Sequence, residues 1–110
     1  MVLLPDPDFT VIAVSKAYAK ATLIDPGKAI GLGLFKLFPD NPDDPKASGV
    51  ANLRTSLQNV VAEKRKDTMA VQRYDVRKAG SDGGELEERF WSPVNNPVFD
   101  AKGNLAYIIH

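Results

Sequence analysis

The sequence predicts an α+β domain in which helices cover one face of an antiparallel sheet. β-Rich segments occupy both ends of the chain, helix signals fill the middle, and a Gly-closed turn joins the last two strands. Strands separated in this way pair most simply in one sheet, with the intervening helices packed on one of its faces. We expect five strands and a single domain over residues 1–110.

The C-terminal hairpin is the clearest element of the chain. β-Branched and aromatic residues over 90–99 predict its first strand, and an apolar run at the end of the chain predicts its second. Asp100 and Gly103 suit the first and last positions of the tight turn between them. Because Pro93 and Pro97 lack an N–H group, we expect the first strand to lose ladder bonds or to bulge.

A second hairpin is predicted at the N-terminus. Residues 1–4 and 9–14 are apolar and β-branched, and the cluster Pro-Asp-Pro-Asp between them is a turn signal. Ser15 can then cap a helix over residues 16–22. Asp25-Pro26 is the start signal of a second short helix.

The longest helix is predicted over residues 45–66. Leu53 and Leu57 belong to an apolar stripe with helical spacing, and acidic residues precede it while basic residues end it, as suits the helix dipole. A strand over residues 69–76 and a Gly-rich turn over residues 78–84 should follow.

Composition argues against several classes of function. Fourteen basic residues balance 14 acidic ones, so no positive field would gather nucleic acid or an anionic membrane. No apolar run approaches the roughly 20 residues of a membrane span, and no signal peptide is visible. The chain has no Cys, which excludes thiolate chemistry and fits a cytoplasmic location. Its one His, His110, is expected to point outward.

Three segments resemble the PAS domain, the sensory module of bacterial sensor kinases and transcriptional regulators. They are LLPDPDFTVIAVSKAYAKAT, AIGLGLFKLFPDNP and SPVNNPVFDAKGNLAYII. The family pattern Ile-Gly-x-x-Leu-Phe is matched by residues 30–35, and Pro-Val-x-Asp-x-x-Gly by residues 97–103. Ser15 stands where Asn is common. The resemblance implies the strand order 2-1-5-4-3, with the last strand at the centre of the sheet.

The resemblance also implies a role within a longer signalling protein. The chain stops inside an apolar strand, so we expect a sensor domain excised from a multidomain protein, dimeric and followed by a histidine kinase or DNA-binding output domain. Flavin-binding members use a Cys and haem-binding members an internal His, and this chain has neither. We therefore expect no such cofactor, leaving an unknown small organic ligand, and no catalytic role for the domain itself.

Acidic residues offer an enzymatic alternative. Glu85, Glu87 and Glu88 could support acid–base chemistry if burial separated their pKa values, but solvated surface charges are the favoured interpretation. The acidic loop 40–44 lacks the Gly and the terminal Glu of a calcium-binding loop, so no metal site is predicted.

The expected ligand site is a groove between the long helix and the sheet. Tyr74 and Trp91 are aromatic with hydrogen-bonding tips, and the amides and hydroxyl of Asn52, Ser56 and Asn95 could orient a ligand. Alternatively, Tyr74 and Trp91 pack in the core or on the outer face of the sheet, and Asn95 only forms hydrogen bonds with the backbone of its strand. The predicted ligand-binding residues are Phe35, Phe38, Asn52, Leu53, Ser56, Leu57, Tyr74, Trp91 and Asn95.

Two functions are therefore expected from different classes. The first is a signal-input domain that binds a small molecule and biases an attached output domain. The second is an interaction module with a filled core, which dimerises through its exposed sheet face or first strand. A hollow groove favours the first, whereas a packed interior with an apolar outer sheet face favours the second.

Overall fold

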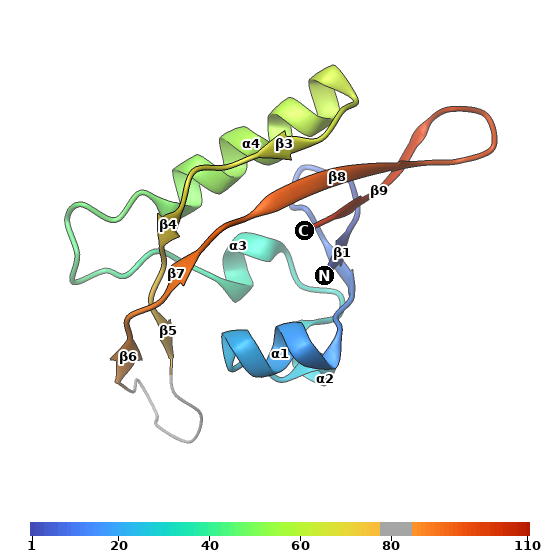
Figure 1. Ribbon diagram of the computed structural model, residues 1–110. Coiled ribbons are helices and arrows are strands. Elements are labelled where there is room, and N and C mark those ends of the chain that lie inside the picture. The colour runs from blue at the N-terminus through green and yellow to red at the C-terminus, as the bar shows by residue number, and fades with distance from the viewer. Residues whose placement is uncertain (78–84) are drawn as a thin grey trace.

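The computed structural model describes residues 1–77 and 85–110, and its centre is a five-stranded antiparallel sheet of order β2-β1-β9-β8-β3 (Figure 1). The predicted order was 2-1-5-4-3 for five strands, and the observed order differs. The described residues between β3 and β8 form four further short strands, and the segment 69–76, predicted as the third strand, lies outside this sheet. The Gly-rich turn predicted over residues 78–84 lies outside the described residues. The strands of this sheet are β1 (Val2–Leu3), β2 (Val11–Ala13), β3 (Asp67–Thr68), β8 (Val94–Phe99) and β9 (Leu105–Ile109).

The short strands form two separate ladders that extend away from this sheet. β4 (Gln72–Arg73) pairs with β7 (Phe90–Trp91), and β5 (Val76–Arg77) pairs with β6 (Leu86–Glu87). The single strands predicted over residues 69–76 and 90–99 were therefore wrong. Pro93 explains the second break, because it cannot donate to a ladder, and its carbonyl instead accepts a hydrogen bond from the Met69 N–H at 3.0 Å.

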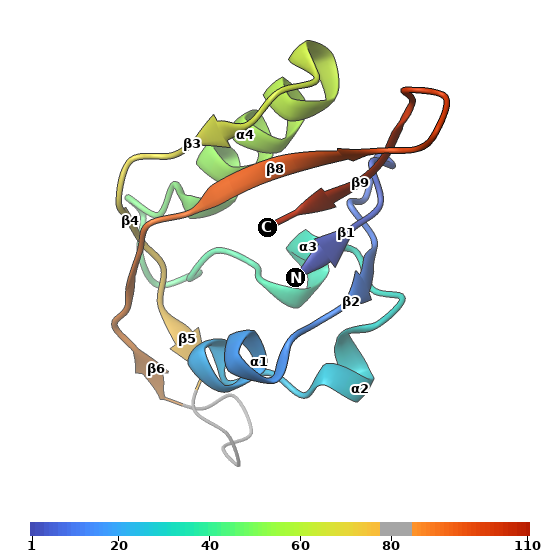
Figure 2. The same cartoon turned by 45° about the vertical axis from the view of Figure 1, so that its right-hand side comes forward.

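The last strand, β9, is the central strand, as predicted. Val2 of β1 lies opposite Ile109 on one side, and Pro97 of β8 lies opposite Ile108 on the other. The two ends of the chain consequently lie side by side (Figure 2). The predicted turn is also present: Gly103 has a φ of +81° and donates its N–H to the Asp100 carbonyl at 3.0 Å.

The first two short helices begin where the sequence signals them. α1 (Lys16–Thr22) is capped by Ser15, whose Oγ accepts the Tyr18 N–H at 3.1 Å. α2 (Pro26–Ala29) follows the Asp25 cap with Pro at its first position, and α3 (Leu34–Leu37) forms the last turn before Pro39. α1 and α3 pack the aromatic side chains of Tyr18, Phe35 and Phe38 against the core.

The long helix, α4 (Gly49–Glu63), is shorter than the predicted residues 45–66. The side chains of Asn41 and Asp44 accept backbone N–H groups two residues further on, at 2.9 Å, and so hold the preceding segment in turns. The expected charged residues therefore lie outside the first and last helical turns. Asp40 supplies the missing cap from a distance, since its Oδ1 accepts the Val50 N–H at 3.0 Å.

The core lies between the helices and one face of the sheet. Leu3, Val11 and Ile108 are fully buried and pack with helix residues that include Leu34 and Leu57. The neighbours of Ile108 in β9, by contrast, are exposed on the opposite face. The alternation confirms the α+β arrangement with helices on one face.

Candidate functional site

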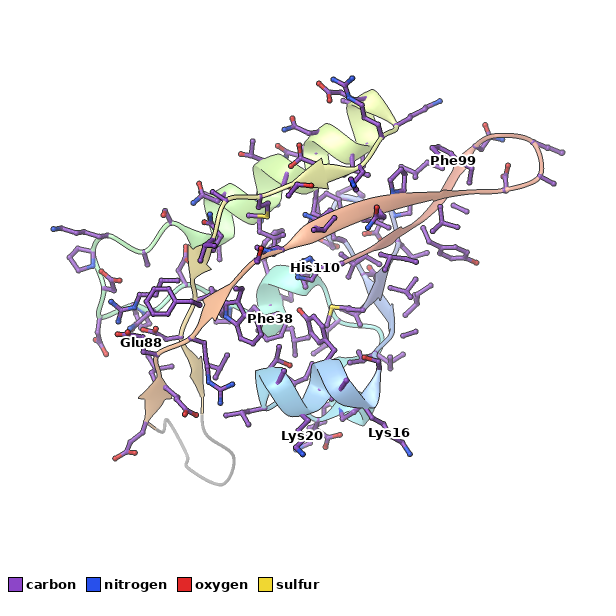
Figure 3. The ribbon with its side chains drawn as sticks, viewed as in Figure 1. Lys16, Lys20, Phe38, Glu88, Phe99 and His110 are labelled. Carbon is purple, nitrogen blue, oxygen red and sulfur yellow. The ribbon has the colours of Figure 1, made fainter. Side chains whose placement is uncertain are left out.

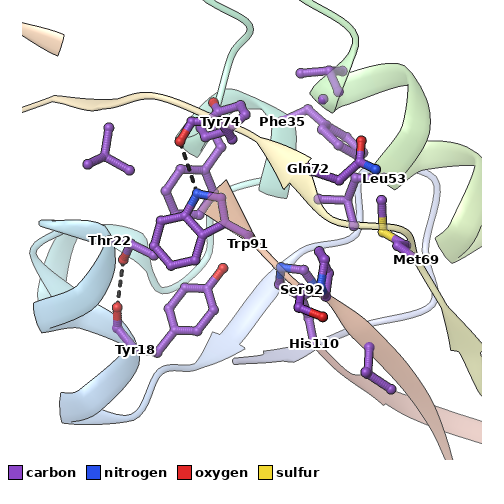
Figure 4. A pocket seen from close by; sticks show the side chains of 16 residues that line it. Tyr18, Thr22, Phe35, Leu53, Met69, Gln72, Tyr74, Trp91, Ser92 and His110 are labelled. Carbon is purple, nitrogen blue, oxygen red and sulfur yellow. Dashed lines mark hydrogen bonds between the residues drawn. The ribbon is translucent and has the colours of Figure 1, made fainter. Parts of the chain in front are cut away.

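A cavity of about 280 Å³ lies between α1, α3, α4 and the ladder formed by β4 and β7 (Figure 4). Its walls are mostly aromatic and aliphatic, and most of its lining side chains are half-buried, so it is open to solvent. Within the described part of the chain, no Asp, Glu, Lys or Arg side chain lines it. Such a cavity suits an organic molecule with few polar groups.

Four rings in sequential edge contact form an aromatic wall, which we define as His110, Tyr18, Phe38 and Tyr74. The ring centroids are 5.8 Å apart for His110 and Tyr18, 6.4 Å for Tyr18 and Phe38, and 5.9 Å for Phe38 and Tyr74. Edge-to-face packing is a favoured geometry for aromatic pairs. In Figure 3, the labelled Phe38 and His110 both lie inward, beneath the β8–β9 ribbon.

Hydrogen bonds fix the wall to the surrounding backbone. The Trp91 Nε1–H donates to the Tyr74 carbonyl at 2.9 Å, and the Tyr74 hydroxyl donates to the Pro39 carbonyl. Gly49 permits this position of Tyr74, because a Cβ at residue 49 would lie 2.9 Å from Tyr74 Cδ2. The aromatic wall is therefore tied to the backbone at Tyr74, whose hydroxyl donates to Pro39 and whose carbonyl accepts from Trp91.

Five of the predicted site residues line this cavity: Phe35, Phe38, Leu53, Tyr74 and Trp91. They come from four separate parts of the chain, which the fold brings together. Leu53 projects from the first half of α4 and is partly buried where the cavity meets the core.

The other four predicted residues do not line it. Asn52 is exposed and donates to Gln72 Oε1 at 2.6 Å, because it lies on the outer side of α4. Leu57 lies one turn beyond Leu53, where the sheet covers it, and it is fully buried in the core. Ser56 and Asn95 are also buried, where they bond to each other.

Ser56 and Asn95 belong to a hydrogen-bonded polar chain, which we define as Asp67, Ser56, Asn95 and His110. The Ser56 hydroxyl donates to Asp67 Oδ2 at 2.5 Å, and Asn95 Nδ2 donates to Ser56 Oγ at 2.8 Å. Asn95 Oδ1 lies 2.7 Å from His110 Nδ1. This polar chain runs through the core from Asp67 in β3 to His110 at the cavity. The buried Asn95 therefore holds the His110 ring without lining the cavity itself.

The prediction that His110 points outward was wrong. Its backbone N–H donates to the Met1 carbonyl at 2.9 Å, and this pairing beside β9 turns the half-buried ring into the cavity. Burial lowers the pKa of His110 to about 4, so the imidazole is neutral at pH 7. The only sequence signal for this placement was the predicted central position of the last strand.

Tyr18 was also missed, because its helix was assigned no part in the site. It faces the cavity from α1, and burial raises the pKa of its hydroxyl. The sequence predicted only a capped helix over residues 16–22, and nothing in that pattern distinguishes a core aromatic from one that lines a cavity.

The acidic residues near the last hairpin form surface ion pairs. Arg89 pairs with Glu87 at 3.0 Å, and Arg73 pairs with Glu88 at 3.3 Å. Pairs at this level of exposure add little stability. Over residues 1–77 and 85–110, no group of three His, Cys, Asp or Glu side chains is arranged to hold a metal ion. The helices in this part of the chain are too short or too polar to cross a membrane.

No family model matches the chain, and no curated protein matches it significantly in sequence. The resemblance to PAS domains therefore stays a prediction, and the candidate site rests on the geometry of its own residues.

Proposed function

We propose that this is a signal-input domain of the PAS kind, which binds a small organic molecule in the cavity and biases an attached output domain. The cavity of about 280 Å³ carries the proposal. An organic ligand that fills this solvent-open cavity removes apolar side-chain surface from water and gains packing contacts with it. The concave shape and the few convergent polar groups are typical of small-molecule sites.

In this proposal the domain is cytoplasmic and has no catalytic role of its own, and the ligand is held without a covalent bond. The output domain is a histidine kinase or a DNA-binding regulator in the same longer chain, and the working unit is a homodimer. The balanced charge of the domain supports assigning no nucleic-acid or membrane contact to it.

Filling the cavity should strongly weaken ligand binding. Val50 lines the cavity from the first turn of α4, so Val50→Phe places a ring in the space and should weaken binding at least about tenfold. Trp91 is the only Trp, so its indole N–H gives one NMR signal at the cavity wall. We would titrate wild type and variant with 2-naphthol and follow this signal.

The matched control is Val61→Phe, on the same helix but exposed and away from the cavity. It should bind like wild type. If neither naphthalene derivatives nor other small aromatic molecules move the Trp91 signal, or if Val50→Phe binds as wild type does, the cavity is not a ligand site.

A ligand in the cavity is expected to act on the central strand. His110 borders the cavity directly after β9, so a ligand contact there can favour one arrangement of β9 over another. Amide hydrogen exchange with and without 2-naphthol should show slower exchange over residues 106–109 as well as in α4. Protection confined to α4 would contradict transmission through β9.

The exposed face of the sheet supports the interaction module as a second candidate. Phe99, Tyr107 and Ile109 are 43%, 41% and 46% exposed. Adjacent exposed apolar side chains are typical of protein contact surfaces. The open cavity favours ligand binding as the primary role, and dimerisation through this face is compatible with it.

A further inference from the structure

The polar chain fixes which nitrogen of His110 carries its proton. The Asp67 carboxylate can only accept, so the single hydroxyl proton of Ser56 is used on Asp67. Ser56 Oγ must then accept from Asn95, which turns the amide nitrogen of Asn95 toward Ser56 and its oxygen toward His110. An amide oxygen cannot donate, so His110 Nδ1 must carry the proton.

The other ring nitrogen, Nε2, is consequently an unprotonated acceptor. It has no hydrogen-bond partner within residues 1–77 and 85–110, and it is not among fully buried atoms, so it borders the cavity that His110 lines. The Tyr18 hydroxyl, on the adjacent ring of the aromatic wall, likewise has no partner in the described structure. Two polar atoms therefore meet the cavity unsatisfied.

Charge and size restrict the ligand further. A charged molecule would lose its hydration without gaining a counter-ion, because no charged side chain of the described residues lines the cavity. An apolar cavity of about 150 Å³ is large enough to hold benzene. The observed volume of about 280 Å³ therefore suits a body of roughly two fused rings.

We infer that the ligand is an uncharged, largely apolar molecule of about bicyclic size that donates a hydrogen bond to His110 Nε2. This inference rests on the proposed function. A hydroxyl group meets the requirement best, because it can donate to His110 and accept from the Tyr18 hydroxyl. Ser56 and Asn95 are positioning residues, which act by holding the imidazole in the accepting tautomer.

Probes that share the naphthalene ring system test whether the ligand must donate a hydrogen bond. 2-Naphthol carries a donor, 2-methoxynaphthalene carries only an acceptor, and naphthalene carries neither. One net hydrogen bond predicts that wild type binds 2-naphthol about fivefold more tightly than the other two, as measured from the Trp91 indole signal. Charged 2-naphthoate should bind weakest of all. Equal affinities for the three neutral probes would overturn the inference.

His110→Phe keeps a ring of similar size but removes the acceptor. It should retain naphthalene binding and lose the preference for 2-naphthol. A preference that persists in this variant would overturn the inference while leaving the cavity as a ligand site. If no probe binds wild type at all, both the inference and the proposed function fail, so the two failures are distinguishable.

The tautomer can be measured without any ligand. His110 is the only His, so nitrogen NMR of the imidazole is free of overlap. Wild type should show a protonated Nδ1 and an unprotonated Nε2. Ser56→Ala frees the Asn95 amide to turn, so a larger fraction with the proton on Nε2 is expected, together with a weaker preference for 2-naphthol. A wild-type proton on Nε2 would overturn the inference.

Discussion

Replacing Asn95 with alanine is expected to lower the free energy of unfolding by about 3 kcal/mol. Asn95 is fully buried, and its side chain bonds both Ser56 and His110. The variant leaves a void and removes the partner of two polar groups. Urea denaturation followed by the fluorescence of Trp91 measures the change, since the chain contains no other Trp.

Asn96→Ala is the matched control for this substitution. Asn96 is the next residue in β8 and is half-buried on the outer face of the sheet, opposite Ile109. Its replacement should change stability by no more than about 0.5 kcal/mol. Similar losses for both variants would mean that the polar chain adds nothing beyond ordinary side-chain packing.

Acidification is expected to destabilise the domain by about 2 kcal/mol through His110. Burial lowers its pKa from 6.5 to about 4 in the fold, and the nearby Met1 ammonium group acts in the same direction. The unfolded chain therefore takes up the proton first. Stability from this group is complete above pH 6.5 and declines as the pH falls toward 4; the half-buried position of His110 limits the loss.

His110→Gln isolates this contribution. The ring contacts Tyr18 and Asn95. The Met1 ammonium group donates to the His110 carbonyl and acts on the ring through its charge, and Asp67 connects to the ring only through Ser56 and Asn95. Denaturation of both proteins between about pH 7.5 and 4 should therefore give a steeper slope for wild type. Losses caused by carboxylates elsewhere are common to both proteins and cancel. Parallel curves would contradict a buried neutral imidazole.

Local signals in the sequence predicted much of the fold. Ser15 caps α1, and Asp100 and Gly103 form the tight turn, because each of these features depends on residues close in sequence. The start of α4 was misplaced because turns centred on Asn41 and Asp44 compete with the helix for the backbone. Such competition depends on local geometry that residue preferences do not describe.

The candidate site was predicted only in part. The apolar stripe indicated the correct side of α4 for Leu53, but residue 52 is exposed and residues 56 and 57 are buried, which depends on tertiary packing that the stripe does not specify. Ser56 and Asn95 suited a ligand contact by residue type, yet they satisfy each other in the fold. His110 enters the site through strand pairing between the two ends of the chain, which no local pattern specifies.

The most direct test of the account is the position of a bound probe. Intermolecular NOEs from 2-naphthol would locate it by the methyl and ring protons that it approaches. A probe bound in the cavity is expected to give NOEs to Val50, Leu53, Trp91 and the ring of His110, all of which line it. NOEs to Tyr107 and Ile109 on the outer face of the sheet, with none to the cavity residues, would contradict it.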